Sequence, residues 1–137
     1  MKLTDEKYKE LISLAKLTRG RSYSPYSHFA VGAALLSEGG KIYTGTNVEN
    51  SSYGATVCAE RSAFFTAVSE GVHDFVAIAV VGGPDDAESH SMCQPCALCL
   101  QVMAEFCDPD FEIILEDGEG GYSVHRFDSL LAKPFRL

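Results

Sequence analysis

The chain has 137 residues, of which 46% are hydrophobic and 22% charged; these values are typical of one globular domain with its own core, which we expect over residues 1–137. Its 11 basic and 19 acidic residues give a formal net charge of −8, which is a poor match for nucleic-acid phosphates and favours a small-molecule substrate. No apolar run approaches the roughly 20 residues of a membrane span, and the N-terminal segment is too polar for a secretory signal, so we expect a cytoplasmic protein without membrane contact.

Hydrophobic periodicity predicts helices that alternate with strands. Apolar residues recur near a 3.6-residue period before Gly20, which is typical of a helix that ends at a glycine, and the continuous apolar run 75–81 suits a buried strand. In chain order we expect a helix over 4–19, strands over 29–36 and 41–47, a helix over 57–69, a strand over 75–81 with a break at 82–86, a helix over 95–106, strands over 111–115 and 122–127, and a short final helix capped by Asp128. This alternation predicts an α/β fold: a three-layer α-β-α sandwich around one mixed five-stranded sheet.

The five cysteines are an odd number in a chain expected in a reducing compartment, where metal binding or catalysis is a more common use of cysteine than disulfides. Cys96 and Cys99 have i, i+3 spacing in the first turn of a predicted helix, which places both sulfurs on one face. Cys58 lies near the start of another predicted helix, and the partial positive charge of helix N-termini favours thiolates. We therefore expect Cys58, Cys96 and Cys99 to bind one zinc ion.

Three protein ligands leave the fourth position of zinc open to water, as in catalytic rather than structural sites. Glu60 follows Cys58 by two residues in the first helical turn, so its carboxylate is placed to take a proton from that water and pass it to a substrate. Three thiolates on Zn²⁺ leave one net negative charge, and we expect the neighbouring Arg61 to offset it by donating hydrogen bonds to a cysteine sulfur.

Other interpretations of these residues remain open. The three cysteines could be buried core thiols, or Cys93 could join them in a structural four-cysteine zinc site, because Cys93 and Cys96 also have C-x-x-C spacing. Glu60 could be a solvated carboxylate favoured by the helix dipole, and Arg61 could form a surface ion pair. Cys107 is expected to be a core thiol.

Four motifs of the chain resemble one known family in their order and spacing. They are YSPYSHFAVGAAL at 23–35, GTNVEN at 45–50, CAER at 58–61 and PCALCLQ at 95–101. Through them the chain resembles, over nearly its whole length, the small homotetrameric cytidine deaminases of the nucleoside-salvage type, which share a zinc-ligand-x-Glu and Pro-Cys-x-x-Cys signature with other deaminases. The resemblance implies hydrolytic deamination of cytidine and 2′-deoxycytidine, one zinc ion per subunit, and active sites at subunit interfaces of a homotetramer.

The resemblance also implies roles for residues outside the metal ligands. Asn47 and Glu49 would bind the ribose 3′-hydroxyl, Phe29 would pack on the pyrimidine ring, the backbone of Ala59 would contact the base, Tyr53 would line the pocket between subunits, Phe135 would reach a neighbour's site, and Gln101 would stand with Arg61 around the metal ligands. Ordinary packing or turn formation is the alternative for these side chains. Ala97 and Leu100 replace the glycine and arginine that are usual in the family's second cysteine motif, and Cys93 is an additional cysteine.

Three alternative functions follow from the same residues. The first is the same chemistry on another aminopyrimidine, such as a blasticidin-type nucleoside. The second is a non-enzymatic, zinc-stabilised binding module, which predicts four cysteine ligands and no open metal position. The third is a polynucleotide deaminase, but a basic groove is expected of such an enzyme, and the acidic composition argues against it.

Overall fold

The computed structural model of the protein describes residues 3–87 and 92–137. The elements are α1 (Asp5–Arg19), β1 (Phe29–Ser37), β2 (Ile42–Thr46), the 3₁₀ turn η1 (Tyr53–Ala55), α2 (Ala59–Ser69), β3 (Phe75–Pro84), α3 (Ala97–Phe106), β4 (Glu112–Glu116), β5 (Tyr122–Arg126) and α4 (Phe127–Leu130). No helix in these two ranges has the length and apolar character needed to cross a bilayer.

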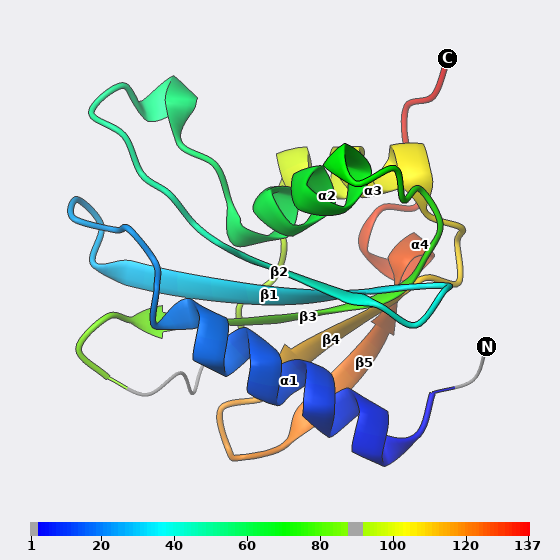
Figure 1. Ribbon diagram of the computed structural model, residues 1–137, viewed down its shortest axis with the longest axis horizontal. Helices are drawn as coiled ribbons and strands as arrows, with labels where there is room; N and C mark the ends of the chain where they lie inside the picture. The colour runs from blue at the N-terminus through cyan, green and yellow to red at the C-terminus, as the bar shows by residue number, and fades with distance from the viewer. Residues whose placement is uncertain (1–2, 88–91) are drawn as a thin grey trace.

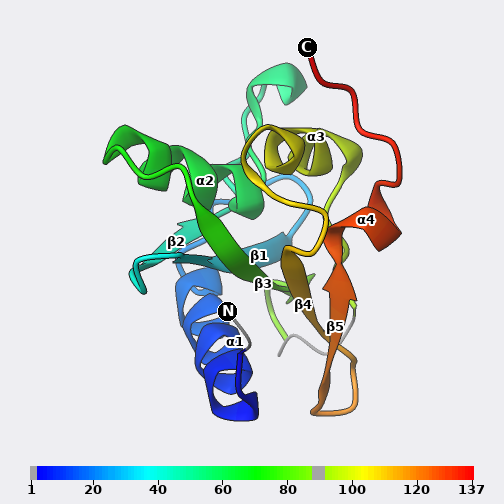
Figure 2. The same ribbon diagram turned by 90° about the vertical axis from the view of Figure 1, so that its right-hand side faces the viewer.

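Within the described residues the strands form one five-stranded sheet in the order β2-β1-β3-β4-β5. Strands β3 and β4 are parallel, whereas β1 pairs antiparallel with β2 and β3, and β4 pairs antiparallel with β5. Helix α1 covers one face of the sheet, and α2 and α3 cover the other (Figures 1 and 2). The prediction of a three-layer sandwich around a mixed five-stranded sheet is confirmed.

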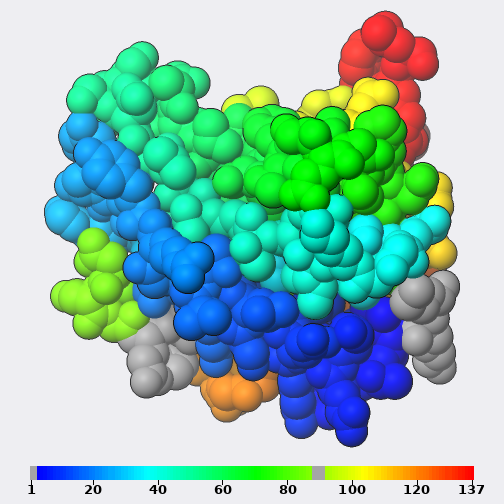
Figure 3. Space-filling view, viewed as in Figure 1, coloured from blue at the N-terminus to red at the C-terminus, as the bar shows by residue number. Residues whose placement is uncertain are grey.

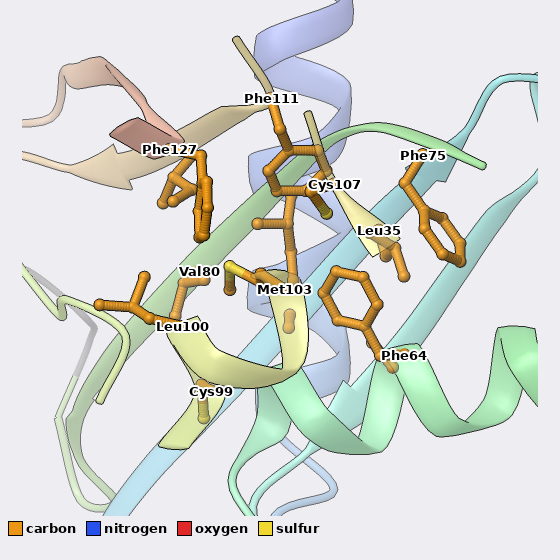
Figure 4. Close-up of a cluster of buried hydrophobic side chains, with 14 of the residues drawn as sticks. Leu35, Phe64, Phe75, Val80, Cys99, Leu100, Met103, Cys107, Phe111 and Phe127 are labelled. Carbon is orange, nitrogen blue, oxygen red and sulfur yellow. The ribbon is translucent and has the colours of Figure 1, made fainter. Parts of the chain in front are cut away.

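The central strands contribute to a core on each face, because successive side chains of a strand point to opposite sides. In β1, Ala33 and Leu35 belong to the core under α2 and α3, whereas Ala34 and Leu36 pack on the side of α1. The first core also contains Phe64 of α2, which is fully buried among aromatic and aliphatic side chains (Figure 4). Burying a side chain of this size contributes roughly 2–3 kcal/mol, so this core holds α2 and α3 firmly on the sheet.

Strand β3 continues through Gly82 to Pro84, although the sequence predicts a break after Val81. The additional residues pair with the start of β1, where Phe29 is opposite Pro84 and Val31 is opposite Gly82. Pairing with a neighbouring strand therefore outweighs the turn preference of the Gly-Gly-Pro segment. Pro84 occupies the strand end, where the loss of one backbone donor is tolerated.

Helices α2 and α3 begin at Ala59 and Ala97, two residues later than the predicted starts at 57 and 95. The preceding residues, Cys58 and Cys96, have extended backbone conformations and occupy the N-cap positions. The two cysteines therefore lie immediately before the first turn of each helix and not within it. This position brings them to the ends where unpaired backbone N–H groups are concentrated.

The start of the last helix also differs from the prediction. Helix α4 has Arg126 as its N-cap residue, so Asp128 lies in the first turn and the prediction of an Asp128 cap is wrong.

Arg19, in the last turn of α1, connects this helix to the ends of two strands. Its guanidinium donates hydrogen bonds to the backbone carbonyls of Ala30, Gly83, Pro84 and Ala87. Several charge-assisted bonds from one planar group fix the relative positions of these backbone segments. The guanidinium thereby fastens α1 to the strand ends that lead to the cleft described below.

At two glycines the backbone of a helix packs directly against the backbone of the sheet. A Cβ atom at Gly32 would lie 2.0 Å from the carbonyl oxygen of Ala15 in α1. A Cβ atom at Gly45 would lie 2.5 Å from the backbone nitrogen of Ala63 in α2. The packing of a helix on each face of the sheet thus requires a glycine at the point of contact.

We expect Gly32→Ala to lower the free energy of unfolding by about 3 kcal/mol, because the added methyl group meets backbone atoms that cannot rotate away. The measurement is urea denaturation at a fixed protein concentration. Gly39→Ala is the matched control, since the nearest atom to its Cβ would be 3.9 Å away, and its effect should stay within about 0.5 kcal/mol. Equal stability of the two variants would contradict the close approach of α1.

Candidate metal centre and active site

Three cysteine sulfurs converge where α2 and α3 begin. The Sγ atoms of Cys58 and Cys96 are 3.6 Å apart, and those of Cys96 and Cys99 are 3.2 Å apart. All three sulfurs lie within 4.8 Å of one another. Cys99 is one helical turn beyond Cys96, so two ligands come from α3 and one from α2.

The arrangement of these sulfurs fits a zinc ion. With Zn–S bonds of about 2.3 Å, two ligands of a tetrahedral site lie roughly 3.8 Å apart, which is close to the separations observed. Thiolates are soft ligands that suit zinc better than magnesium or calcium. Cys58, Cys96 and Cys99 are therefore the residues that would hold the metal.

The cluster favours at least one thiolate before any metal binds. The pKa of Cys58 is lowered to about 5, chiefly by a hydrogen bond from the Cys99 thiol and further by the guanidinium of Arg61. The pKa of Cys99 is raised, because its proton is held between the two sulfurs and because the thiol is buried. Zinc binding would release the remaining thiol protons, since the ligands of zinc are thiolates.

Arg61 is placed to compensate the negative charge of these sulfurs. Its Nη2 atom donates to the Sγ atom of Cys58 and to the carbonyl of Thr56, each at 3.5 Å. Its Nε atom is buried and has no hydrogen-bond partner among the described residues. This contact with Cys58 is the one anticipated from the sequence, and among residues 3–87 and 92–137 Arg61 has no ion pair with a carboxylate.

The two remaining cysteines stand apart from the three-sulfur cluster. Among the described residues, the group close enough to hold one metal ion comprises Cys58, Cys96 and Cys99, without Cys93. Burial, together with the nearby charge of Glu60, raises the pKa of Cys93 to about 12. Cys107 is buried in the core under α3. This geometry disfavours a structural site with four cysteines.

Glu60 lies in the first turn of α2 and is only 4% exposed. Burial raises the pKa of its carboxyl to about 7, and the negative charge of Cys58 adds to the effect. A carboxyl with a pKa near neutrality can both accept and donate a proton at the same pH. This behaviour differs from that of a solvated first-turn carboxylate.

A cleft of about 330 Å³ connects the sulfur cluster to a set of polar and aromatic residues. Its wall includes all of the following: Ser27, Phe29, Val31, Asn47, Glu49, Thr56, Val57, Cys58, Ala59, Glu60, Cys93, Gln94 and Cys96. Phe29 is 38% exposed at the start of β1, so its ring is accessible to a ligand. Ala59 is fully buried at the first position of α2, where backbone N–H groups lack helical partners.

Asn47 is held in place by the backbone around it. Its Oδ1 atom accepts hydrogen bonds from Val31 N at 2.9 Å and from the Ser22 hydroxyl, and its Nδ2 atom donates to the carbonyl of Phe29 at 2.8 Å. An amide nitrogen carries two donors, and within the described part of the chain only one N–H of Asn47 has a partner. The side chain thus has a structural role and a second donor that a ligand could use.

The chain matches the model of a known protein family. The model for the cytidine and deoxycytidylate deaminase zinc-binding region matches residues 5–114. The chain belongs to this family.

Individual relatives agree with this assignment. A cytidine deaminase of Sporosarcina psychrophila is 49% identical over 126 residues, which cover 92% of this chain and 89% of that protein. The crystal structure of a cytidine deaminase from Burkholderia pseudomallei has a TM-score of 0.84 at 42% identity, covering 97% of this chain and 100% of that chain. A blasticidin-S deaminase of Bacillus cereus is more distant, at 32% identity over 110 residues, or 78% of this chain and 77% of that protein.

Tyr53 and Phe135 of this deaminase lie on segments that project from the single chain. Tyr53 is 81% exposed on η1, beside a second hollow of about 340 Å³ that shares Ser27 and Glu49 with the cleft. Phe135 is 70% exposed on the C-terminal tail, which extends beyond α3 (Figures 1 and 3). Neither side chain is among the residues that line the cleft beside the sulfurs.

Gln101 contacts the C-terminal tail. Its Nε2 atom donates a hydrogen bond to the carbonyl of Phe135 at 2.9 Å, and Arg136 Nε donates to the carbonyl of Ala104 at 3.0 Å. Both contacts bind the tail to α3, whose N-cap residue Cys96 and first-turn residue Cys99 carry two of the sulfurs. In this structure Gln101 thus contacts the C-terminal tail, and its predicted place around the metal ligands stays a prediction.

The sequence interpretation missed Ser27 as a residue of the cleft. It lies on the loop before β1, where hydrophobic periodicity gives no signal, and it lines both hollows. The only available signal was its place in the YSHF segment, two residues before the predicted aromatic contact Phe29.

We expect the purified deaminase to contain one zinc ion per chain and Cys96→Ala to lose most of it, because a tetrahedral site with two remaining thiolates binds zinc far more weakly. Cys93→Ala is the matched control and should retain the metal. Elemental analysis gives the zinc content, and X-ray absorption should count three sulfurs and one lighter ligand. Equal loss of zinc from both variants, or four sulfurs in the native protein, would contradict the three-cysteine site.

Removal of the charge on Arg61 should weaken zinc binding. In Arg61→Gln the pKa of Cys58 rises, because the guanidinium that lowers it is gone, so we expect the loss of affinity to be greater at pH 6 than at pH 8. Competition with a chromophoric chelator measures the affinity, and Arg61→Lys, which keeps the positive charge, should be intermediate. An unchanged affinity and pH dependence in Arg61→Gln would rule out this role.

Proposed function

We propose that the protein catalyses the hydrolytic deamination of cytidine and 2′-deoxycytidine to uridine and 2′-deoxyuridine, with release of ammonia. One observation carries the proposal: the buried carboxylate Glu60 lines a cleft large enough for a nucleoside, together with Cys58 and Cys96 of the three-sulfur cluster. Membership of the zinc-binding deaminase family agrees with this chemistry.

The residues of the chain supply the proton transfers. When bound, zinc lowers the pKa of water toward about 7, which provides a nucleophile at neutral pH. Glu60 takes a proton from the attacking water and delivers it to N3 of the pyrimidine, which makes C4 more electrophilic. The water oxygen then bonds to C4. Glu60 takes the second proton from this oxygen and passes it to the amino group, so that C4=O forms as the C4–N bond breaks and ammonia leaves.

The cleft favours a nucleoside over a nucleotide. Glu49 contributes a carboxylate, and none of the described residues that line the cleft is Lys or Arg, so a phosphate would meet negative charge without a compensating cation. Phe29 offers a ring face for the base. Asn47 and Glu49 offer a donor and an acceptor for the ribose 3′-hydroxyl, and the Ala59 backbone offers an N–H group for the base.

Blasticidin-type nucleosides are the alternative substrates. The similarity to a blasticidin-S deaminase extends over most of the chain, but a relative named as a cytidine deaminase is considerably more similar. A side-by-side assay of cytidine, 2′-deoxycytidine and blasticidin S separates the two functions.

We infer that the active enzyme is a homotetramer with one zinc per subunit and with sites completed at subunit interfaces. The exposure of Tyr53 and Phe135 on the single chain supports this assembly, because aromatic side chains of this kind are enriched at interfaces. A cytoplasmic location in pyrimidine salvage suits the cluster of reduced thiols, which an oxidising compartment would endanger.

We expect the zinc-loaded protein to convert cytidine to uridine and ammonia, with activity lost on chelation. Glu60→Gln should keep its zinc and lower kcat by at least about a thousandfold, because the amide cannot transfer protons. Uridine is followed by ultraviolet absorbance and ammonia by a coupled assay.

Glu70→Gln provides a control, because this carboxylate lies at the far end of α2 and pairs with Lys41. Its kcat should remain within about twofold of the native value. Turnover retained in Glu60→Gln would defeat the assignment of Glu60, and a lack of activity in the native zinc protein on every cytosine nucleoside would favour the non-enzymatic zinc module.

A further inference from the structure

The carboxylate of Glu49 is enclosed by the loop before β1. Its Oε1 atom accepts hydrogen bonds from the backbone nitrogens of Tyr26 at 3.0 Å and Ser27 at 3.1 Å. Its Oε2 atom accepts a hydrogen bond from the Ser27 hydroxyl. Ser27 therefore contacts both oxygens of Glu49, one through its main chain and one through its side chain.

The Ser27 hydroxyl is itself oriented by the next strand. The backbone N–H of Phe29 donates to Ser27 Oγ at 3.0 Å, so that oxygen is occupied as an acceptor and its hydrogen remains for Glu49. Between these residues His28 has a φ of 56°, a left-handed conformation that is uncommon for a residue other than glycine. This strained backbone lies in the loop that contacts Glu49, and such strain is typical of functional sites.

We propose that Ser27 is a positioning residue that fixes the Glu49 carboxylate for recognition of the ribose 3′-hydroxyl. The proposal rests on the proposed function, in which Glu49 binds that hydroxyl. An ionised carboxylate has about four lone-pair sites, and the loop occupies three of them. The rotation of the carboxylate is thereby restricted, and the remaining acceptor position is held ready before the substrate arrives.

The ionisation state of Glu49 is consistent with this role. The Ser27 hydroxyl is the main cause that lowers the pKa of the Glu49 carboxyl, and the backbone N–H groups of Ser27 and Tyr26 add to the effect. Glu49 thus remains an acceptor throughout the neutral range. A protonated carboxyl would compete with the ribose hydroxyl as a donor.

The loop has a second attachment that does not involve Glu49. The hydroxyl groups of Tyr26 and Ser51 are 2.6 Å apart, and they join segment 22–28 to segment 50–56 at one end of the molecule (Figure 3). Loss of this bond loosens the same loop without altering the carboxylate contacts. Ser51→Ala is therefore the matched control for Ser27→Ala.

The test compares kcat/KM for cytidine with kcat/KM for 3′-deoxycytidine, measured with excess enzyme so that a slow substrate still gives a rate constant. In Ser27→Ala we expect kcat/KM for cytidine to fall about tenfold, mainly through KM, which is the loss expected for one hydrogen bond to a charged group. The value for 3′-deoxycytidine should remain within about twofold, because that substrate lacks the hydroxyl that Glu49 would bind. The ratio of the two constants should be close to native in Ser27→Thr, which restores a hydroxyl, and in Ser51→Ala.

The outcomes separate this proposal from the proposed function. Native protein without cytidine turnover refutes the deaminase activity. Native protein that turns over cytidine, combined with an unchanged ratio in Ser27→Ala, refutes only the positioning role. An equal fall for both substrates in Ser27→Ala likewise overturns it, because the serine would then support the cleft as a whole.

Discussion

The site depends on one constraint, the meeting of two helix N-termini on the same face of the sheet. Cys58 and Cys96 are the N-cap residues of α2 and α3, and both helices are fixed by the large core beneath them. The helix dipoles and Arg61 together offset the charge of neighbouring sulfurs. Without that compensation, three thiolates at such short distances would repel one another.

The same burial that holds the helices also shifts the pKa of Glu60, the proposed acid–base group. Glu60 follows Cys58 on α2 and is carried below the surface by the packing of the helix. Loss of solvation raises its pKa to about 7, whereas Glu49, on a loop with several donors, has a lowered pKa. Two carboxylates in one cleft thereby acquire different properties, one suited to moving protons and one to accepting hydrogen bonds.

The fold class and the pair Cys96 and Cys99 could be predicted because they depend on local spacing, whereas Cys58 was predicted from its position at the start of a second helix, 38 residues away. The helix and strand elements predicted from the i, i+3 cysteines and from the alternating apolar runs are present in the structure. The extension of β3 to Pro84 could not be predicted, because it depends on pairing with Phe29 at the distant start of β1. The contact of Gln101 with Phe135, and that of Ser27 with Glu49, are equally non-local, since they join loops and a tail whose course has no periodic signal.

The hydrogen bonds of Arg19 give the helix on the opposite face an influence on the cleft. Arg19 is the last residue of α1, and its guanidinium binds the carbonyls of Ala30 and Gly83. These two residues are the chain neighbours of Phe29 and Gly82. A Cβ atom at Gly82 would approach the sulfur of Cys93 to 2.7 Å and the ring of Phe29 to 3.1 Å, so the cleft wall has little tolerance for displacement there. The layer opposite the sulfur cluster thus helps to fix the position of Phe29, the residue proposed to contact the base, because Arg19 holds the backbone beside it.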